Sequence, residues 1–363
     1  MKWSHTQDDL GDFKIGVEGA WEMRDAGYMS PKERFMSALY GGRVDRPAVG
    51  SATSVISVEV MDEVGVHFPE AHLDPYKMAE LAMAAHYVLG HDNVAPLFSA
   101  IHDASGLDVA VDWGDRTMMP EVKEHPWAEV SDIKMPPDYL DREGVRVPLE
   151  AIRILRRELG NRVAIVGKVY GPWSLAYHMF GVQDFLIWTL LEPEKVRAIL
   201  RELMEIVVTY ANAQVEAGAD ALCYGDHATG DLVSRQMYVD FLRDLHKEIR
   251  KRINAPLILH ICGNTLDRMP DIAETTMACF HFDSNVDPAA AKAAVNGKIS
   301  LMGNIDNSVT LLTGTPADVR AEVFRALDAG IDIIGPACAV PLTAPIANLL
   351  EIRRSVDAYI AGG

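Results

Sequence analysis

Short apolar runs recur along the whole chain, and longer segments with apolar residues at helical spacing separate them. Because the runs are almost continuously apolar, they are typical of strands buried on both faces of a parallel sheet. Eight such strands with helical crossovers predict an α/β fold of the (β/α)8 barrel type. A doubly wound sheet is the alternative, although neither a G-x-G-x-x-G motif nor a P-loop follows any run. The predicted strands span residues 47–53, 93–99, 162–171, 219–226, 255–262, 278–284, 299–305 and 332–338.

The first clear helix start divides the chain into an N-terminal segment and a main body. In "SPKERFMSALYGG" Ser30 is a good N-cap and Glu33 completes a capping box. Residues 1–29 are polar and mixed, and we predict an N-terminal arm that packs on the body or on a second subunit. Residues 30–363 are predicted to form a single barrel domain, and a homo-oligomer is one option.

Composition and charge narrow the class of protein. The 363 residues are 49% apolar with a mean hydropathy of +0.02, so a sizeable core is available. The net charge is −18, which repels phosphate backbones and argues against nucleic acid as a partner. No run approaches the ~18–20 apolar residues that span a bilayer, and the N-terminus lacks the apolar core of a signal peptide. We therefore expect a cytoplasmic protein without a membrane partner.

The run 255–262 delivers a histidine and a cysteine to the end of one predicted strand. His260 and Cys262 are two residues apart, so both side chains point to the same face of the strand. In a barrel this end of the strands carries the chemistry, and Gly263 lets the chain turn there without crowding it. Cys338 ends the last predicted strand, so only the closed fold brings it to the other two. The three residues predict a metal site.

One histidine and two cysteines form a ligand set that suits zinc. Three protein ligands leave a fourth position open, as in catalytic zinc sites, and Asp283 in "HFDSNVD" is the candidate for an exchangeable fourth ligand. Two thiolates weaken zinc as a Lewis acid for hydrolysis and favour a bound substrate thiolate that stays nucleophilic. The alternative is that cysteines in strands are plain core residues, which is our interpretation of Cys223 and Cys279.

Other polar residues near predicted strand ends are candidates for the substrate side of the site. The candidates for a catalytic part are Asp226, Asp283 and Asn304, and those for lining the cofactor pocket are Tyr170, His178 and His227. Asn304 would act by hydrogen-bonding a zinc ligand. Ordinary packing or turn capping is the alternative for each. Four histidines in a helical stretch are expected to be surface or packing residues: His67, His72, His86 and His91.

Several motifs together resemble the uroporphyrinogen decarboxylase superfamily and, within it, the methylcobamide:coenzyme M methyltransferases. The resemblance extends from about residue 30 to the end of the chain. It rests on "SPKERFMSALYGGRVDRPAV", "FPEAHLDPYKMAELAMAAH", "VYGPWSLAYHMFG", "LHICGNT", "LMGNID" and "PACAVPLTAPIANL". The specific part is the joint pattern of a His-x-Cys pair and a distant Cys, since each piece alone would be weak.

This resemblance implies an activity, a cofactor and a partner. In the family the His-x-Cys pair and the distant Cys hold zinc, which places those roles on His260, Cys262 and Cys338. The implied activity moves a methyl group between methylcobalamin on a separate corrinoid protein and a small thiol such as coenzyme M, through a zinc-bound thiolate. The usual corrinoid-binding signature, Asp-x-His-x-x-Gly, is absent from this chain, which agrees with a corrinoid carried by a partner.

The residues leave other functions open. The methanogen members have Glu-Glu-Lys where this chain has Asp-Ser-Asn at 283–285, so the fourth ligand and the acceptor could differ. The alternatives are a methyltransferase that demethylates a methoxy, methylamine or methylthio donor, and a non-catalytic zinc barrel that docks partners. Porphyrinogen decarboxylation fits poorly, because segment 47–118 contains a single arginine, Arg116, to meet the carboxylates of such a substrate.

Overall fold

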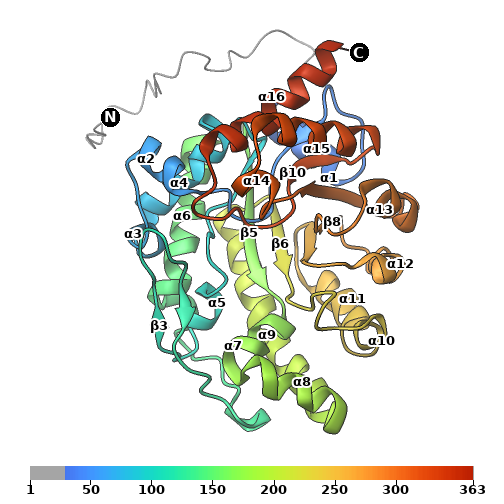
Figure 1. The fold of residues 1–363 in the computed structure, drawn as a ribbon. Helices are drawn as coiled ribbons and strands as arrows, with labels where there is room; N and C mark the ends of the chain where they lie inside the picture. Colours follow the sequence, from blue (N-terminus) through green and yellow to red (C-terminus); the bar gives the residue numbers. More distant parts are fainter. Residues whose placement is uncertain (1–28, 363) are drawn as a thin grey trace.

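The computed structural model describes residues 29–362, and its centre is a sheet of eight parallel strands curled into a nearly closed barrel (Figure 1). In the sheet the strands follow the order β1–β10–β9–β8–β7–β6–β5–β2. They are β1 (Ala48–Val49), β2 (Asn93–Val94), β5 (Ala164–Tyr170), β6 (Ala221–Gly225), β7 (Leu257–Ile261), β8 (Cys279–Phe282), β9 (Ser300–Ile305) and β10 (Ile333–Pro336). Each lies within a predicted run, which confirms the barrel. The predicted arm, 1–29, lies outside the described residues except for Met29.

Helices separate consecutive barrel strands along the chain and cover the outside of the barrel (Figure 1). The longer ones are α1 (Pro31–Leu39), α2 (Val58–Val64), α4 (Pro75–Tyr87), α6 (Glu143–Leu159), α7 (Pro172–Phe180), α8 (Val182–Leu191), α9 (Pro193–Ala217), α11 (Arg243–Arg252), α13 (Pro288–Val295), α15 (Pro316–Asp328) and α16 (Ile346–Gly362). Helices of three or four residues are α3 (Glu70–Leu73), α5 (His102–Ser105), α10 (Arg235–Met237), α12 (Met269–Ile272) and α14 (Thr310–Thr313).

The segment between β2 and β5 is the least regular part of the fold. It holds a small antiparallel pair, β3 (Val111–Asp112) and β4 (Glu121–Val122), and the short turns η1 (Val130–Asp132) and η2 (Tyr139–Asp141). Between later strands lie a π-helical segment, η3 (Tyr238–Leu242), which joins α10 to α11, and a short turn, η4 (Leu266–Arg268). The apolar pattern does not predict β3 and β4, because two-residue strands leave no periodicity to detect.

Helix α1 closes the N-terminal end of the barrel. The predicted capping box is confirmed, since Ser30 Oγ accepts from the Glu33 N–H while the Glu33 carboxylate accepts from the Ser30 N–H at 2.8 Å. Caps of this kind typically stabilise by about 1 kcal/mol. Phe35 and Leu39 are fully buried among inward-facing strand residues. The Ser300 hydroxyl, at the start of β9, donates to the Leu39 carbonyl at 2.7 Å and fixes the helix against the strands.

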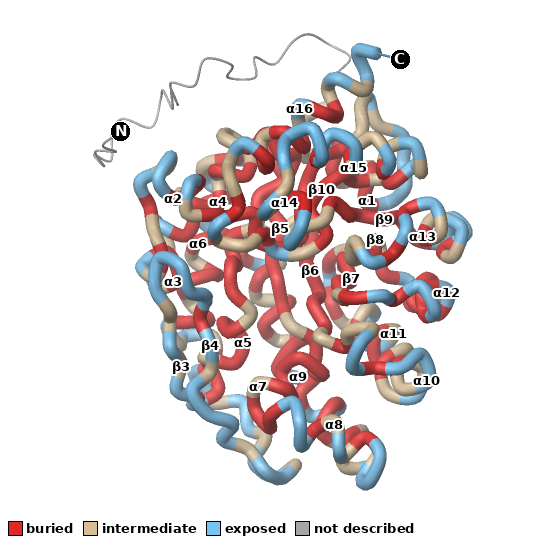
Figure 2. The backbone as a smooth tube through the Cα atoms, viewed as in Figure 1, coloured by how far each residue is buried: buried red, intermediate tan, exposed pale blue. Residues whose placement is uncertain are grey.

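Inside the barrel the strand register stacks the inward-facing residues in layers. One layer holds Lys168, Cys223, Ile258 and Cys279, and the next layer toward the C-terminal strand ends holds Tyr170, Gly225, His260 and His281. The barrel strands appear as a buried core in Figure 2, with exposed segments on the surrounding helices and loops. Cys223 and Cys279 belong to the core as predicted, and burial raises the pKa of Cys223 to about 12. Chemistry-bearing side chains therefore gather at one end of an otherwise apolar interior.

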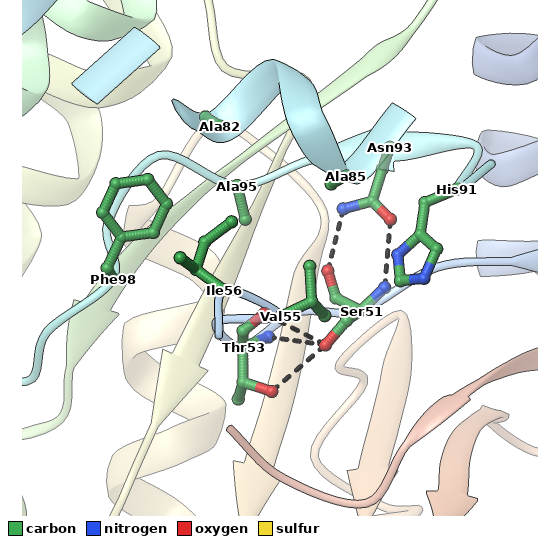
Figure 3. Close-up of a pocket in the computed structure, with 10 residues that line it drawn as sticks. All are labelled: Ser51, Thr53, Val55, Ile56, Ala82, Ala85, His91, Asn93, Ala95 and Phe98. Carbon is green, nitrogen blue, oxygen red and sulfur yellow. Dashed lines mark hydrogen bonds between the residues drawn. The ribbon is translucent and has the colours of Figure 1, made fainter. Parts of the chain in front are cut away.

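β1 and β2 are joined by one backbone hydrogen bond and by the side chain of Asn93, in place of a strand ladder. The Asp92 N–H donates to the Val49 carbonyl at 2.7 Å. The Asn93 amide then donates to the Ser51 carbonyl at 2.8 Å and accepts from the Ser51 N–H at 3.1 Å (Figure 3). A cavity of about 10 Å³ lies beside this seam, with room for about one water molecule. None of the metal-ligand candidates described below lines this cavity.

Among residues 29–362, no helix combines the length and the apolar content that a membrane span requires.

Candidate metal centre

The three predicted metal ligands meet at the C-terminal ends of the barrel strands. His260 lies in β7, Cys262 directly follows that strand, and Cys338 follows β10. The Cys262 Sγ lies 3.2 Å from His260 Nε2 and 3.3 Å from Cys338 Sγ. The Cys338 Sγ lies 3.4 Å from the same Nε2. Within the described part of the chain, these residues form the one group of histidine, cysteine and carboxylate side chains with the spacing that a single metal ion needs.

A glycine turn holds the β7 end of this cluster in place. Gly263 has a φ of +78°, a left-handed conformation that glycine adopts without strain. Its N–H donates to Asp283 Oδ2 at 2.9 Å, which ties the ends of β7 and β8 together. The neighbouring loops are also close, because a Cβ added at Gly230 would lie 2.0 Å from the Asn264 carbonyl oxygen. The backbone around Cys262 is therefore constrained from two sides.

The ring of His260 is oriented by the neighbouring strand. Its Nδ1 lies 3.1 Å from the His281 carbonyl oxygen, so the proton is on Nδ1 and the Nε2 lone pair faces the two sulfurs. The His281 ring lies 4.5 Å from the His260 ring, and its Nε2 donates to the Pro336 carbonyl at 2.8 Å. Burial lowers the pKa of His281 to about 3, so this ring is neutral. His281 thus links β8 to β10 directly beneath the cluster.

The two thiols titrate as a pair. The pKa of Cys338 is lowered, because its thiolate accepts a hydrogen bond from Cys262 and lies beside His260. The pKa of Cys262 is raised, first because its S–H is the donor in that bond and then because it is buried. One proton is therefore held between the sulfurs. Binding of a divalent cation would release it, since metal ligation requires thiolates.

The donor set fits zinc. Bonds of about 2.0–2.3 Å in tetrahedral geometry place ligand atoms roughly 3.5–3.8 Å apart, a few tenths of an ångström beyond the spacing seen between these three atoms. Both cysteines are free thiols, and a histidine with its Nε2 lone pair turned inward completes a soft, borderline set. His260, Cys262 and Cys338 could therefore hold a zinc ion with a fourth position left for another ligand.

Two of the candidate catalytic residues lie next to this cluster. The Asp283 carboxylate accepts from the Gly263 and Asn285 N–H groups, at 2.9 and 3.0 Å. It is engaged with backbone and does not belong to the group with metal-ligand spacing. The buried Asn304 amide donates to the Val286 carbonyl at 2.8 Å and to the Asp283 carbonyl at 3.3 Å. Asn304 therefore contacts the loop that carries Asp283, and its contacts to a zinc ligand stay a prediction.

The three residues predicted to line the cofactor pocket form a connected set of rings. The Tyr170 ring lies 5.1 Å from that of His227, which lies 5.9 Å from that of His178. Burial lowers the pKa of His178 to about 4 and also lowers that of His227, so both rings are neutral near pH 7. The structure thus brings these residues together on the β5 and β6 side of the barrel mouth. Their contact with a cofactor stays a prediction.

Asp226, the remaining catalytic candidate, is held by structural contacts. It is 1% exposed and follows β6. Its carboxylate accepts from the Ser174 N–H at 3.0 Å, in the first turn of α7, and from His246 Nε2 at 3.0 Å, in α11. These contacts cap one helix and anchor another. A part of Asp226 in the reaction stays a prediction.

The four histidines of the helical stretch lie in surface or packing positions, as expected. His67 pairs with Asp62 at the surface, and His72 stacks on Phe68 with ring centroids 4.2 Å apart. His91 is buried, and its carbonyl oxygen lies 2.7 Å from His86 Nδ1.

Sequence reasoning missed two residues beside the site. His281 sits opposite His260 in the strand register, and the signal was its place in "ACFHFDS", one strand along from the ligand pair. Lys168 is a buried cation inside β5, and the signal was a lysine in the apolar run "RVAIVGKVYG".

A buried carboxyl also contacts β5: Asp103, in α5, accepts from the Tyr170 N–H at 2.9 Å. Burial raises the pKa of Asp103 to about 7.

The fold and the cluster together define this protein as an α/β barrel with a candidate metal site at the C-terminal ends of its strands. Comparison with known proteins gives its family. Residues 30–359 match the family model described as uroporphyrinogen decarboxylase (URO-D), so the chain belongs to that family. This confirms the superfamily resemblance found in the motifs.

Within the family the chain is similar to methyltransferases. It is 32% identical to a methylcobamide:CoM methyltransferase, MtaA, of Methanosarcina barkeri, over 91% of this chain and 98% of that protein. It is 31% identical to a methylated-thiol–coenzyme M methyltransferase of Methanosarcina mazei, over 90% of this chain and 89% of that one. The solved structure of a methyltransferase from Methanosarcina mazei superposes with a TM-score of 0.88 at 31% identity, covering 92% of this chain and 99% of that chain.

Proposed function

We propose that this protein is a zinc-dependent methyltransferase that transfers a methyl group between a methylated corrinoid protein and a small thiol. The observation that carries the proposal is the cluster of His260, Cys262 and Cys338 within ligand distance of one another at the barrel mouth. Support comes from the similarity of nine tenths of the chain to proteins named for methylcobamide and coenzyme M. In the transfer a sulfur–methyl bond forms from the thiol's electron pair, the cobalt–methyl bond breaks, and cobalt keeps the bonding pair.

We assign a separate role to each residue around the cluster. Zinc in this site would lower the pKa of a thiol bound to it, which is the chemistry that the metal supplies. His281 keeps the His260 ring in place through the β8–β10 contacts. Asp283, hydrogen-bonded one residue beyond Cys262, takes the thiol proton or serves as the exchangeable fourth ligand. Asn304 holds the Asp283 loop.

We assign the remaining candidates to the walls of the site. Tyr170, His178 and His227 present neutral rings on one side of the mouth, where they would contact the bound thiol and the edge of the corrinoid. Asp226 positions α7, which carries His178, through its bond to the Ser174 N–H.

Exposed apolar side chains around the mouth suit the docking of the corrinoid protein. Large apolar residues with at least a third of their surface exposed follow the ends of four strands: Val182 after β5, Leu232 after β6, Leu266 after β7 and Val309 after β9. We propose that these residues contribute to the surface that the corrinoid protein contacts. We expect the double substitution Leu232→Ser with Leu266→Ser to raise the KM for the methylated corrinoid protein several-fold. The rate with free methylcobalamin should not change.

The test of the proposed function uses zinc-loaded protein, free methylcob(III)alamin and a set of small thiols. Loss of the cobalt–methyl bond is followed by absorbance. We expect thiol-dependent demethylation in the wild type and none in Cys338→Ser. If none of the thiols supports demethylation by protein that is shown to hold one zinc ion, the proposal is wrong.

One observation favours the reverse direction as a second candidate. The Methanosarcina mazei relative is named for a methylated thiol, and its similarity covers most of both chains. The same side chains would then serve a methylthio donor, with the methyl group moving from sulfur to cob(I)alamin. Supplying methylated thiols with cob(I)alamin, and measuring which direction runs faster, decides between the two.

A further inference from the structure

The two cysteine sulfurs of the candidate metal centre lie in direct contact with each other. Cys262 Sγ is 3.3 Å from Cys338 Sγ. In a disulfide the two sulfur atoms are about 2.05 Å apart, so a shift of little more than ~1 Å at the sulfurs would allow a bond to form. The spacing that suits a metal ion therefore also suits oxidation of the pair.

The backbone holds both cysteines at this spacing. Around Cys262 the chain is fixed by the glycine turn and the neighbouring loop described above. Around Cys338 the N–H of the preceding residue donates to the Ile305 carbonyl at 2.8 Å, and the N–H two residues further on donates to the Ser54 carbonyl at 2.9 Å. Because these bonds lie within the protein, they keep the sulfurs paired without the help of a metal.

These two cysteines are also the ones that a small molecule can reach. The chain has four cysteines, of which Cys223 and Cys279 are 1% and 0% exposed. Cys262 and Cys338 are half-buried at the barrel mouth. Thiol–disulfide exchange needs an accessible thiolate, and cysteines that ligate zinc are thiolates. Both conditions are met at this pair and not in the barrel core.

A bond between the two sulfurs would exclude the metal. Cys262 follows β7 and Cys338 follows β10, and β8 and β9 lie between these strands in the sheet, so the bond would span the mouth. It would consume both thiolates and leave His260 Nε2 as the one remaining ligand atom of the cluster. Zinc sites in proteins use three or four ligands, so a single imidazole would not retain the ion.

We propose that Cys262 and Cys338 form a redox switch, in which a small disulfide oxidises the pair to an intramolecular disulfide and the metal is released. First, one cysteine thiolate attacks a sulfur of the small disulfide, whose S–S bond breaks and releases one small thiolate. The other cysteine thiolate then attacks the protein sulfur of this mixed disulfide and releases the second small thiolate. Two cysteine thiolates are thereby oxidised, the small disulfide is reduced, and zinc leaves as Zn²⁺. Excess thiol reverses both steps.

This inference goes beyond the proposed function, because it depends on the paired cysteines and not on methyl transfer. Where it rests on the proposed function, it adds regulation of the same site. The reduced form of a small thiol would accept the methyl group, and its disulfide would switch the protein off.

The test treats zinc-loaded full-length protein with 2-hydroxyethyl disulfide and needs no activity assay. Released zinc is measured with a colorimetric chelator, free thiols are counted by titration, and the cross-link is located by peptide mass mapping. We expect release of the bound zinc and loss of two of the four thiols. The one cross-link found should join Cys262 to Cys338. Excess 2-mercaptoethanol, with zinc added back, should restore both the thiols and the bound metal.

Two variants separate the pair from the other cysteines. Cys223→Ala removes a core thiol one layer below the cluster and is the matched control, so zinc release and the cross-link should be unchanged. Cys262→Ser lacks the second attacking thiolate. Its reaction should therefore stop at a mixed disulfide between Cys338 and the small thiol.

The outcomes are distinguishable. If zinc stays bound and all four thiols stay free, while the same reagent oxidises the urea-unfolded chain, the inference is wrong and the proposed function is unaffected. If the wild type stops at mixed disulfides, or pairs a mouth cysteine with Cys223, the inference is also wrong. If the cross-link forms and zinc is released, but the zinc-loaded protein methylates no thiol, the switch stands and the proposed function fails.

Discussion

The two ends of the barrel interior are built on the same strands but carry opposite chemistry. Near the N-terminal ends, Ala164, Val166 and Phe35 pack into an apolar core closed by α1. Further along the strands the inward positions are taken by Lys168 and, one layer on, by His260 and its neighbours. A barrel strand thus switches from packing to chemistry within one repeat of its pleat.

This difference teaches where substitutions should act. Substitutions in the layers toward the N-terminal strand ends should alter the stability of the fold and leave metal binding intact, because no candidate metal ligand lies in those layers. Changes in the upper layers should alter metal or ligand binding, while the fold rests on the core beneath. The layer of Lys168 and Cys223 is the boundary, with a cation and a plain core thiol side by side.

The largest effect should come from removing a ligand. Cys338→Ser should lower zinc affinity more than about a hundredfold, because even contacts outside the ligand set typically give ten- to a hundredfold. Zinc per chain after dialysis is the measurement, with circular dichroism to confirm the fold. Cys223→Ala, a core cysteine one layer down, is the matched control and should keep its zinc. Equal zinc in both variants would remove the distinction between the two layers.

The next effect tests the apolar packing directly below the cluster. Ile258→Ala lies two residues before His260 and removes a fully buried side chain. We expect a loss of about 3 kcal/mol in the free energy of unfolding, from lost burial and the cavity left behind. Urea denaturation measures it, and zinc affinity measured alongside should stay within about twofold. A large loss of zinc binding with little loss of stability would reverse the comparison.

A smaller effect, a change of about 2–3 kcal/mol between pH 5 and pH 8, should follow from Asp103. Burial raises the pKa of its carboxyl from 3.8 to about 7, so the folded chain keeps a proton that the unfolded chain releases. This contribution to stability is complete below pH 3.8 and is lost as the pH rises to about 7. Asp103→Asn removes that dependence while its oxygen still accepts from the Tyr170 N–H. The variant should gain on the wild type between pH 5 and pH 8 in urea titrations; parallel stability curves would contradict this.

The smallest effect concerns the residue that supports the cluster without ligating it. His281→Leu removes the bond to the Pro336 carbonyl and should weaken zinc binding about tenfold, or about 1.4 kcal/mol. His281→Gln can still donate from the side chain and should recover most of that loss. A metal-competition titration gives both values. If the Gln variant is as weak as the Leu variant, the hydrogen bond is not what positions the site.

The sequence predicts the barrel well, because strands buried on both faces leave continuous apolar runs. It also predicts the ligand cluster, since the His260 and Cys262 spacing marks one strand face and Cys338 lies at another strand end. What it does not predict depends on pairing between distant segments. Asp226 is a visible candidate at a strand end, but its contacts to α7 and α11 become apparent only in three dimensions. The strand register likewise reveals His281 as a neighbour of His260.

The side-chain closure of the barrel has a consequence for mutational tolerance. Asn93 both donates to and accepts from the backbone of Ser51, so one amide replaces two ladder bonds. Aspartate offers no donor, leucine offers neither group, and glutamine is longer by one methylene in a buried position. In a saturation library this position should therefore be as intolerant as the cysteines of the cluster. Such data would not distinguish residues that close the barrel from residues that the proposed reaction requires, because both would tolerate no substitution. Only a measurement of metal content would distinguish them.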